Sequence, residues 1–204
     1  MTDSSMTTRL YPLFVNLRNR TCVVVGGSEM AEAKTRELLD TGARIRLIAH
    51  EVTAQISAWA QDGILKWEPR AYASGDLQEA FLVVSAADSD TNARVFAEAE
   101  RQNIFCNAVD DTPHCSCYAS AVVRRGPLQI AISTAGNSPA LAQRLRKEFE
   151  QQFTEEYGPW VRQLGETRAL LFQNETITAE NRRKILHDQA SAAAFETFLT
   201  SGRG

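Results

Sequence analysis

The stretch Val24-Val25-Gly26-Gly27-Ser28-Glu29-Met30-Ala31 decides which fold the sequence predicts. It overlaps the apolar run at 21–25, which has the length and the valine content of a buried strand. It also opens a helical pattern at 30–41, which stops at Gly42, a common residue just past a helix end. A glycine turn between a strand and a helix is the context in which a domain can bind a dinucleotide.

This turn has the features that a bound pyrophosphate requires. Gly26 permits a tight turn, Ala31 lets the helix pack closely on the strand, and the start of the helix offers free backbone N–H groups. Ser28 stands where a glycine is usual, so its side chain limits how closely the backbone approaches the phosphates. The alternative is a strand-to-helix turn without a ligand, but the context favours binding. The positions expected to contact a bound dinucleotide are Gly26, Gly27, Ser28, Glu29, Met30 and Ala31.

Apolar runs and helical patterns alternate through the first half of the chain. Further strands are expected at residues 44–48, 64–68, 81–85 and 104–109, and further helices at 52–61 and 90–102. Strands that alternate with helices indicate a parallel sheet with right-handed crossovers. The sequence therefore predicts an α/β fold with a Rossmann-like, doubly wound parallel sheet.

The pattern changes near Asp110. Strand-like runs at 117–123 and 128–133 are joined by Arg124-Arg125-Gly126-Pro127, a link that suits a hairpin. Such a small second sheet is also able to pair across a dimer. Ser138-Pro139 then opens a helix, since serine can cap it and proline fits its first position.

The rest of the chain reads as helical. Leu141, Leu145, Phe149 and Phe153 recur every four residues and define an apolar stripe. Further short helices are expected at 179–189 and 192–199. A helical region therefore follows the small sheet.

The composition excludes several classes of protein. The 204 residues are 44% apolar and 23% charged, which is ordinary for a globular protein with a core of useful size. No stretch approaches the ~20 apolar residues that span a bilayer. Residues 1–8 are polar and lack the apolar core of a signal peptide, so a cytoplasmic protein is expected. The net charge of −3 argues against nucleic acid as the main partner, because such a surface is basic.

Polar residues follow the expected strands at their carboxyl ends, where sheets of this kind bind ligands. An acid that binds ribose is expected about 20 residues after the glycine turn. Glu51 is the nearest acid, and His50 is alternatively placed to contact adenosine; a solvated loop is an equally good interpretation of both. After the strand at 81–85, Ala87 and Asp88 lie in a loop that lines the crevice. In the same loop, Asp90 is a good helix N-cap.

Asp110 follows the strand at 104–109 on the same edge, where a carboxylate would face a bound nicotinamide. It is a candidate acid/base residue, and a loop cap is the alternative. His114 is a second candidate proton carrier, because histidine titrates near neutrality.

The four cysteines are expected to be reduced in a cytoplasmic protein. Cys22 and Cys106 lie in apolar runs and are expected to be buried. The cluster His114-Cys115-Ser116-Cys117 permits a soft-metal hypothesis. However, the usual two-residue spacer and a second pair of cysteines are missing, so no metal ligands are assigned.

Hydroxyl, glycine and basic residues gather in the expected hairpin link and beyond it. The stretch 133–139 lies just before a helix start and suits an anionic group. Arg124 and Arg125 are able to receive substrate carboxylates, whereas Arg146 and Lys147 are better interpreted as solvated helix charges. The candidate substrate-binding residues are Arg124, Arg125, Ser133, Thr134 and Asn137.

Several ordered motifs resemble one known family. They lie at residues 10–17, 23–31, 86–88, 104–110, 127–133 and 136–139. Together they resemble the precorrin-2 dehydrogenase/sirohydrochlorin ferrochelatase family, which includes the N-terminal half of multifunctional siroheme synthase. The resemblance runs from about Leu10 to Phe153 and is weaker through the C-terminal helices. No methyltransferase domain like that of the longer siroheme synthases is expected, since the chain has no room for one.

The resemblance implies the NAD-dependent oxidation of precorrin-2 to sirohydrochlorin, and in many members the insertion of ferrous iron. It implies an intertwined homodimer with tetrapyrrole sites near the subunit junction. The important aspartate of the family falls on Asp110, to which the resemblance assigns proton removal. The substrate carries many carboxylates, which gives Arg124 and Arg125 a purpose. The alternatives are a chelatase without oxidation, which takes ferrous or cobalt ions, and a non-catalytic protein that binds a tetrapyrrole or a nucleotide.

The resemblance also divides the chain. It implies a NAD-binding Rossmann-like domain at 1–113, a dimerisation region at 114–145 and a helical C-terminal region at 146–204. Three features depart from the family pattern. Ser28 replaces a glycine, and Thr134 replaces a serine that some siroheme synthases associate with phosphorylation and the tetrapyrrole site. The cluster 114–117 replaces small apolar residues that are common after the aspartate motif.

Overall fold

The computed structural model describes residues 9–201, so the expectation for the polar segment 1–8 lies outside the described residues. The chain forms two compact units, which divide between Ala119 and Ser120. Between residues 9 and 201, no helix is long and apolar enough to cross a membrane. The predicted division at 113 and 145 into three functional regions stays a prediction.

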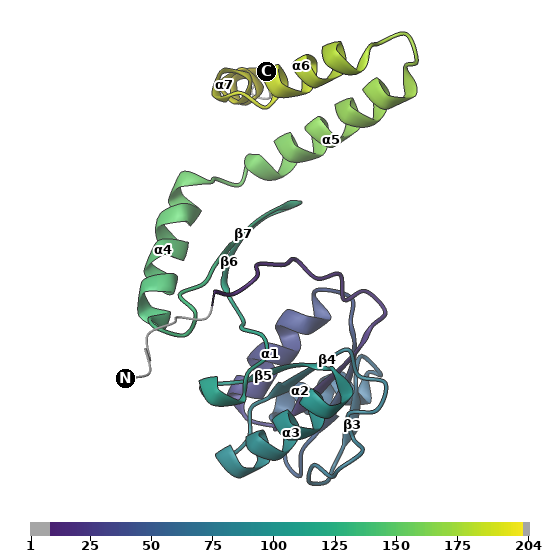
Figure 1. Cartoon of the computed structure of the whole chain (residues 1–204), viewed down its shortest axis with the longest axis vertical. Coiled ribbons are helices and arrows are strands. Elements are labelled where there is room, and N and C mark those ends of the chain that lie inside the picture. The colour runs from purple at the N-terminus through teal and green to yellow at the C-terminus, as the bar shows by residue number, and fades with distance from the viewer. Residues whose placement is uncertain (1–8, 202–204) are drawn as a thin grey trace, which may run out of the picture. The chain divides into compact units, whose positions relative to one another are not determined.

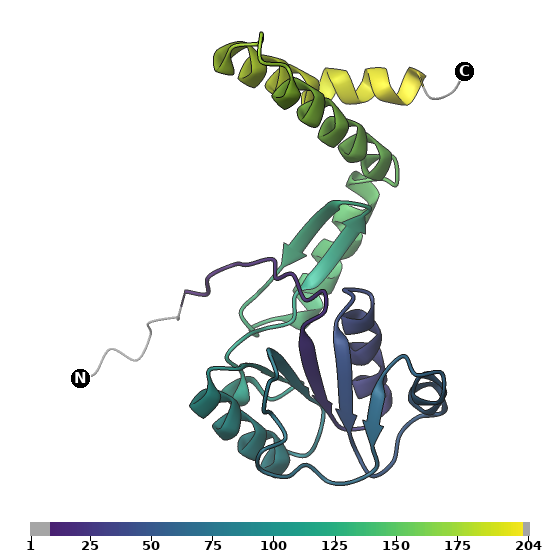
Figure 2. The same cartoon turned by 90° about the vertical axis from the view of Figure 1, so that its right-hand side faces the viewer.

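The first unit is built on a five-stranded parallel sheet (Figure 2). Its strands are β1 (Thr21–Val25), β2 (Arg44–Ile48), β3 (Lys66–Glu68), β4 (Leu82–Ser85) and β5 (Phe105–Ala108). They lie in the order β3-β2-β1-β4-β5, and every neighbouring pair is parallel. This order confirms the predicted Rossmann-like, doubly wound sheet.

The side chains of β1 alternate between two layers of the core. Cys22 and Val24 pack in one cluster with Ala31 and Leu38 of α1 (Glu29–Leu39), which also takes in α2 (Ala54–Gln61). Val23 and Val25 pack in the other cluster, which takes in α3 (Ser89–Gln102). Because successive side chains of a strand point to opposite faces, one run of apolar residues supports helices on both sides of the sheet.

Side-chain caps decide where the helices begin. Thr53 accepts a hydrogen bond from the backbone N–H of Ile56, so α2 begins at Ala54, two residues later than the apolar pattern suggests. The prediction that Asp90 caps α3 was wrong. The N-cap of α3 is Asp88, two residues before the predicted cap, and its side chain accepts from the N–H of Thr91. Asp90 therefore lies in the first turn of the helix.

The expected strand at 64–68 is shorter in the structure. The backbone N–H groups of Ile64 and Leu65 bond to the carbonyl of Trp59 at the end of α2, so β3 begins only at Lys66. No helix connects β3 to β4. A loop of turns makes this crossover instead.

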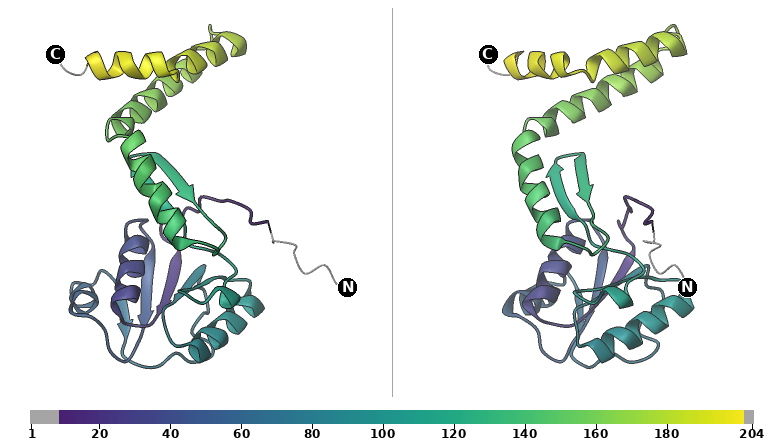
Figure 3. Two further views of the ribbon diagram at one scale, coloured as in Figure 1. Left: turned by 90° about the vertical axis from the view of Figure 1, so that its left-hand side faces the viewer. Right: turned by 60° about the vertical axis from the view of Figure 1, so that its left-hand side comes forward.

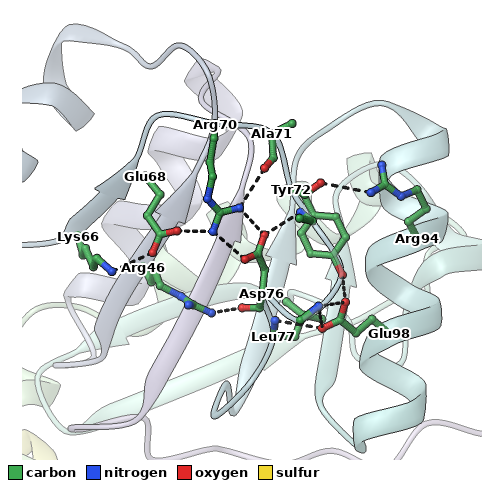
Figure 4. Close-up of polar contacts among 12 residues, drawn as sticks. Arg46, Lys66, Glu68, Arg70, Ala71, Tyr72, Asp76, Leu77, Arg94 and Glu98 are labelled. Atoms are coloured by element: carbon green, nitrogen blue, oxygen red, sulfur yellow. Dashed lines mark hydrogen bonds and ion pairs between the residues drawn. The ribbon is translucent and has the colours of Figure 1, made fainter.

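Polar contacts hold this crossover loop in place (Figure 4). Arg70 pairs with both carboxylate oxygens of Asp76 at 2.7 Å and also contacts Glu68. Glu98 of α3 is only 2% exposed, and it accepts hydrogen bonds from Tyr72 and from the backbone N–H groups of the loop. The loop also packs Tyr72 and Leu77 into the core, so buried polar contacts and apolar packing together hold it without a crossover helix.

The second unit begins with a hairpin, as predicted. Strands β6 (Ala121–Arg125) and β7 (Leu128–Ile132) are antiparallel, and Gly126 has a φ of 56° at the turn between them. The strand begins at 121 rather than at 117. The reason is that the N–H groups of Ser116 and Cys117 still bond to β5, at the carbonyl of Cys106.

After the hairpin, the described part of the second unit, up to residue 201, has four helices: α4 (Pro139–Gln152), α5 (Tyr157–Gln173), α6 (Ala179–Gln189) and α7 (Ala192–Ser201) (Figure 1). Ser138 caps α4, and Pro139 is its first residue, as predicted. Helix α4 lies beside the hairpin (Figure 3). The rings of Tyr157 and Trp160 pack against Phe195, which joins α5 to α7.

Candidate functional site

The glycine turn lies in close contact with two other loops of the first unit. A Cβ atom on Gly26, which has a φ of +115°, would lie 2.4 Å from the carbonyl oxygen of Ala86, just after β4. A Cβ atom on Gly27 would lie 1.8 Å from the carbonyl oxygen of Glu51, after β2. The turn between β1 and α1 thus meets the loops after β2 and β4 at the point where the strand order reverses. This is the place where doubly wound sheets bind ligands.

The start of α1 fits a pyrophosphate. Ser28 accepts a hydrogen bond from the N–H of Ala31 at 3.4 Å and caps the helix. Within the part of the chain that the structure describes, the N–H groups of Glu29 and Met30 have no hydrogen-bond acceptor. Two free N–H groups at the positive end of a helix are suited to a phosphate. Ala31 is fully buried, so its role is close packing of α1 on the sheet.

The structure brings His50 and Glu51 close to this turn. Both residues are exposed in the loop after β2, and the backbone of Glu51 is in contact with Gly27. An adenosine that extends from the pyrophosphate toward β2 would meet this loop. Ribose or adenosine binding by either side chain stays a prediction.

Asp88 has a structural role that its sequence position did not reveal. Its carboxylate accepts hydrogen bonds from the backbone N–H of Thr91 at 2.9 Å and from the Thr91 hydroxyl at 3.0 Å. These bonds hold the pKa of Asp88 below its usual range. Its neighbour Ala87 is half-buried on the same loop. Capping of α3 accounts for Asp88, and contact with NAD stays a prediction for both residues.

Asp110 is exposed just after β5 and has a φ of +56°. Aspartate is one of the few residues other than glycine that adopts this left-handed conformation readily. The residue stands at the carboxyl edge of the sheet, as predicted.

The sequence analysis missed the next residue, Asp111. Its Oδ1 lies 2.9 Å from Nδ1 of His114, and its Oδ2 accepts a hydrogen bond of 3.1 Å from Asn92 of α3. These two partners, with His114 contributing most, hold the pKa of Asp111 below its usual range. His114 is therefore paired with a carboxylate. The spacing Asp-x-x-His was the available signal, because the short 3-10 helix Thr112–His114 brings residues three apart together.

All four cysteines are free thiols in the structure. Cys22 and Cys106 are fully buried, as predicted. Burial raises the pKa of Cys117 to about 11 and that of Cys106 to about 12. The Cys115 thiol donates to the carbonyl of Ala108 at 3.2 Å. Among residues 9–201, no group of three or more His, Cys, Asp or Glu side chains is placed to hold a metal ion.

In the second unit, the two candidate arginines differ. Arg125 donates to the carbonyls of Phe153 at 2.7 Å and of Glu150 at 2.9 Å, and its side chain is only 12% exposed. These bonds join β6 to the end of α4, so most of its N–H groups are engaged. Arg124 is exposed on the same strand. Arg124 is the better candidate for a substrate carboxylate, and Arg125 has a structural role.

The candidate anion loop is organised by its own hydrogen bonds. The Ser133 hydroxyl accepts from the N–H of Ala135 at 3.1 Å, and the Thr134 hydroxyl accepts from the N–H of Ser138 at 3.1 Å. The Asn137 side chain donates to the carbonyl of Thr134 at 2.9 Å. Ser133 and Asn137 are exposed, and substrate binding by the three polar residues stays a prediction.

Two family models match the chain. One, described as "Putative NAD(P)-binding", matches residues 13–121, which covers more than half of the chain. The other, described as "Sirohaem biosynthesis protein central", matches residues 125–152. The first match contains the sheet and the glycine turn, and the second contains the turn of the hairpin, β7 and α4.

Curated relatives are named siroheme synthases. Siroheme synthase 1 of Serratia proteamaculans (strain 568) is 34% identical over 193 residues, and the match covers 94% of this chain. Siroheme synthase 2 of Yersinia enterocolitica (serotype O:8 / biotype 1B) is 37% identical over 184 residues, or 88% of this chain. The chain spans about 40% of the length of these relatives.

A solved structure has the same architecture over nearly its whole length. The structure titled "SirC, precorrin-2 dehydrogenase" has a TM-score of 0.73 and 25% sequence identity to this chain, and the match covers 94% of this chain and 98% of the other. The glycine turn, the strand order and these matches agree with one another. The chain therefore belongs to the NAD(P)-binding family, in the group that includes the siroheme synthases and precorrin-2 dehydrogenase.

Proposed function

We propose that this protein oxidises precorrin-2 to sirohydrochlorin and passes the hydride to NAD. The observation that carries the proposal is the similarity to a precorrin-2 dehydrogenase over 98% of that chain. An unrelated oxidoreductase with a Rossmann-like domain would not be expected to share the hairpin and the C-terminal helices as well. The free N–H groups at the start of α1 support the choice of NAD.

Each group of residues has a part in this reaction. The N–H groups of Glu29 and Met30 would hold the pyrophosphate, and the loop that carries His50 and Glu51 would meet the adenosine. When bound, NAD supplies the acceptor for the hydride. The proton that leaves with the hydride requires a base, and Asp110 is the candidate that the family resemblance favours.

The partners follow from the same proposal. The substrate is a tetrapyrrole with many carboxylates, which Arg124 would receive as charge-assisted hydrogen bonds together with the polar loop at 133–137. A cytoplasmic homodimer and the insertion of ferrous or cobalt ions into sirohydrochlorin belong to the proposal as well. In that step the metal ion would be a substrate of the reaction.

One assay separates the candidate functions. The protein is mixed anaerobically with precorrin-2, with and without NAD, and then with ferrous or cobalt ions. Appearance of sirohydrochlorin together with NADH supports the dehydrogenase. Metal insertion without any oxidation would indicate a chelatase, and calorimetric binding without either reaction would indicate a binding protein.

The variant Asp110→Asn tests the proposed base. Asparagine tolerates the positive φ of this position, so the substitution removes the charge without straining the backbone. If Asp110 is the base, turnover should fall while NAD still binds. The control is Asp62→Asn, which makes the same substitution at an exposed residue at the end of α2. Full turnover of Asp110→Asn would remove Asp110 from the mechanism.

A further inference from the structure

A chain of side-chain hydrogen bonds runs from the core of the first unit to its carboxyl edge. Ser85, at the end of β4, is fully buried, and Asn92 of α3 is 2% exposed. The Ser85 hydroxyl donates to Oδ1 of Asn92 at 2.6 Å. The Asn92 amide nitrogen therefore points the other way and donates to Oδ2 of Asp111 at 3.1 Å.

Asp111 accepts at both ends. It precedes the 3-10 helix Thr112–His114, but its side chain makes no capping bond there. One oxygen faces the Asn92 amide, and the other lies 2.9 Å from Nδ1 of His114. Because a carboxylate has only acceptors, Nδ1 of His114 must carry a proton. In the neutral imidazole the lone pair is then on Nε2.

The ring of His114 is also held from the side. Its centroid lies 5.8 Å from that of Phe96, at an interplanar angle of 59°. The His114 side chain is 27% exposed, so part of the side chain stays accessible. Packing and the Asp111 bond together fix the position and the tautomer of a side chain that stays accessible.

We propose that His114, in place of Asp110, accepts the proton during the oxidation and that Asp111, held by Asn92 and Ser85, is the positioning residue for it. This inference rests on the proposed function. In the step, a C–H bond of the substrate gives its electron pair and hydrogen to NAD, which becomes NADH. An N–H or C–H proton of the substrate passes to Nε2 of His114. The Asp111 carboxylate then faces an imidazolium, which it stabilises.

Nuclear magnetic resonance tests the tautomer without any substrate. The chain has three histidines, so a spectrum of His114→Gln identifies the imidazole signals of His114 in ¹⁵N-labelled protein. We expect a protonated Nδ1 and an unprotonated Nε2 in the neutral ring. Asp111→Asn, whose amide is able to donate toward Nδ1, should shift the ring toward the Nε2-protonated form. An Nε2-protonated ring in the unmodified protein would overturn the inference.

Kinetics test the role in the reaction. Asp111→Asn should lower kcat for precorrin-2 by about 10²-fold, the order that a positioned base contributes, with little change in KM or in the Kd for NAD. Asp62→Asn is the control. An unchanged kcat of Asp111→Asn would contradict the role of His114 and would leave Asp110 as the candidate base. If the unmodified protein oxidised no precorrin-2, the proposed function would fail. The magnetic resonance spectra would still show which nitrogen of His114 carries the proton, because they need no substrate.

Discussion

Replacement of Gly27 by alanine perturbs the glycine turn at its most crowded point. The added Cβ would lie 1.8 Å from the carbonyl oxygen of Glu51, whereas real Cβ atoms keep at least 3.0 Å from such an atom. The obstacle is backbone, so no side-chain rotation relieves it. The loop after β2 must retreat by 1.2 Å or more.

The cost follows from two contacts. Forced overpacking of a tight site costs about 1–3 kcal/mol. The retreat also stretches the 3.1 Å hydrogen bond from the N–H of Thr53 to the carbonyl of Gly27, which is worth about 1 kcal/mol. We expect Gly27→Ala to lower the free energy of unfolding of the first unit by about 2–4 kcal/mol. Because the same loop would meet the adenosine, the Kd for NAD should rise as well.

Urea unfolding measures this loss. The background variant Trp160→Phe leaves Trp59 and Trp67, both in the first unit, as the fluorescent reporters. The control is Gly165→Ala in α5, where an added Cβ meets nothing within 4 Å. An alanine in that helix should stabilise the second unit by about 0.5–1 kcal/mol, as followed by circular dichroism.

A substitution on the surface changes the free energy of unfolding by about 0.5 kcal/mol or less. If Gly27→Ala changes the free energy of unfolding of the background protein by no more than that, the glycine turn and the loop after β2 are not in close contact. A stable Gly27→Ala that binds NAD normally would also remove the glycine turn from the proposed cofactor site.

Three further predictions separate neighbouring roles. Arg125→Ala should destabilise the second unit in urea, whereas Arg124→Ala should raise KM for precorrin-2 without changing stability; the reverse pattern would contradict the assigned roles. Ser28→Gly should cost only a few tenths of a kcal/mol, because glycine also caps helices, and should tighten NAD binding in calorimetry, whereas weaker binding would show that Ser28 does not obstruct the phosphates. Hydrogen bonds from Arg70 hold the pKa of Asp76 below its usual range, so their stabilisation is complete above the unfolded pKa of about 4 and is lost as the pH falls. The loss of stability in Arg70→Met should therefore be largest near neutral pH and shrink in acid, and a pH-independent loss in urea unfolding would contradict this.

The parts of the fold that depend on local pattern could be predicted. The strands β1 and β2, the hairpin and the cap at Ser138 all follow from residues that are adjacent in the chain. The crossover loop before β4 could not be predicted. It is held by Glu98, which lies more than twenty residues further along, and no local pattern reveals such a partner.

The same limit applies to the site. The glycine turn and Asp110 were found because each stands directly after a predicted strand. The bonds of Arg125 to carbonyls at the end of α4, some 25 residues away, were invisible in the sequence, so the residue was interpreted only by its charge. Asp111 was missed because its partner Asn92 is on another helix, although His114 is close in sequence.

A single-turnover experiment tests the central claim most directly. The protein is mixed anaerobically with NAD and a known amount of precorrin-2, without added metal, and the sirohydrochlorin and NADH spectra are followed together. The account predicts that both products appear at the same rate and in equal amounts. Sirohydrochlorin that forms without NADH, or precorrin-2 that stays unchanged beside folded protein with NAD bound, would contradict it.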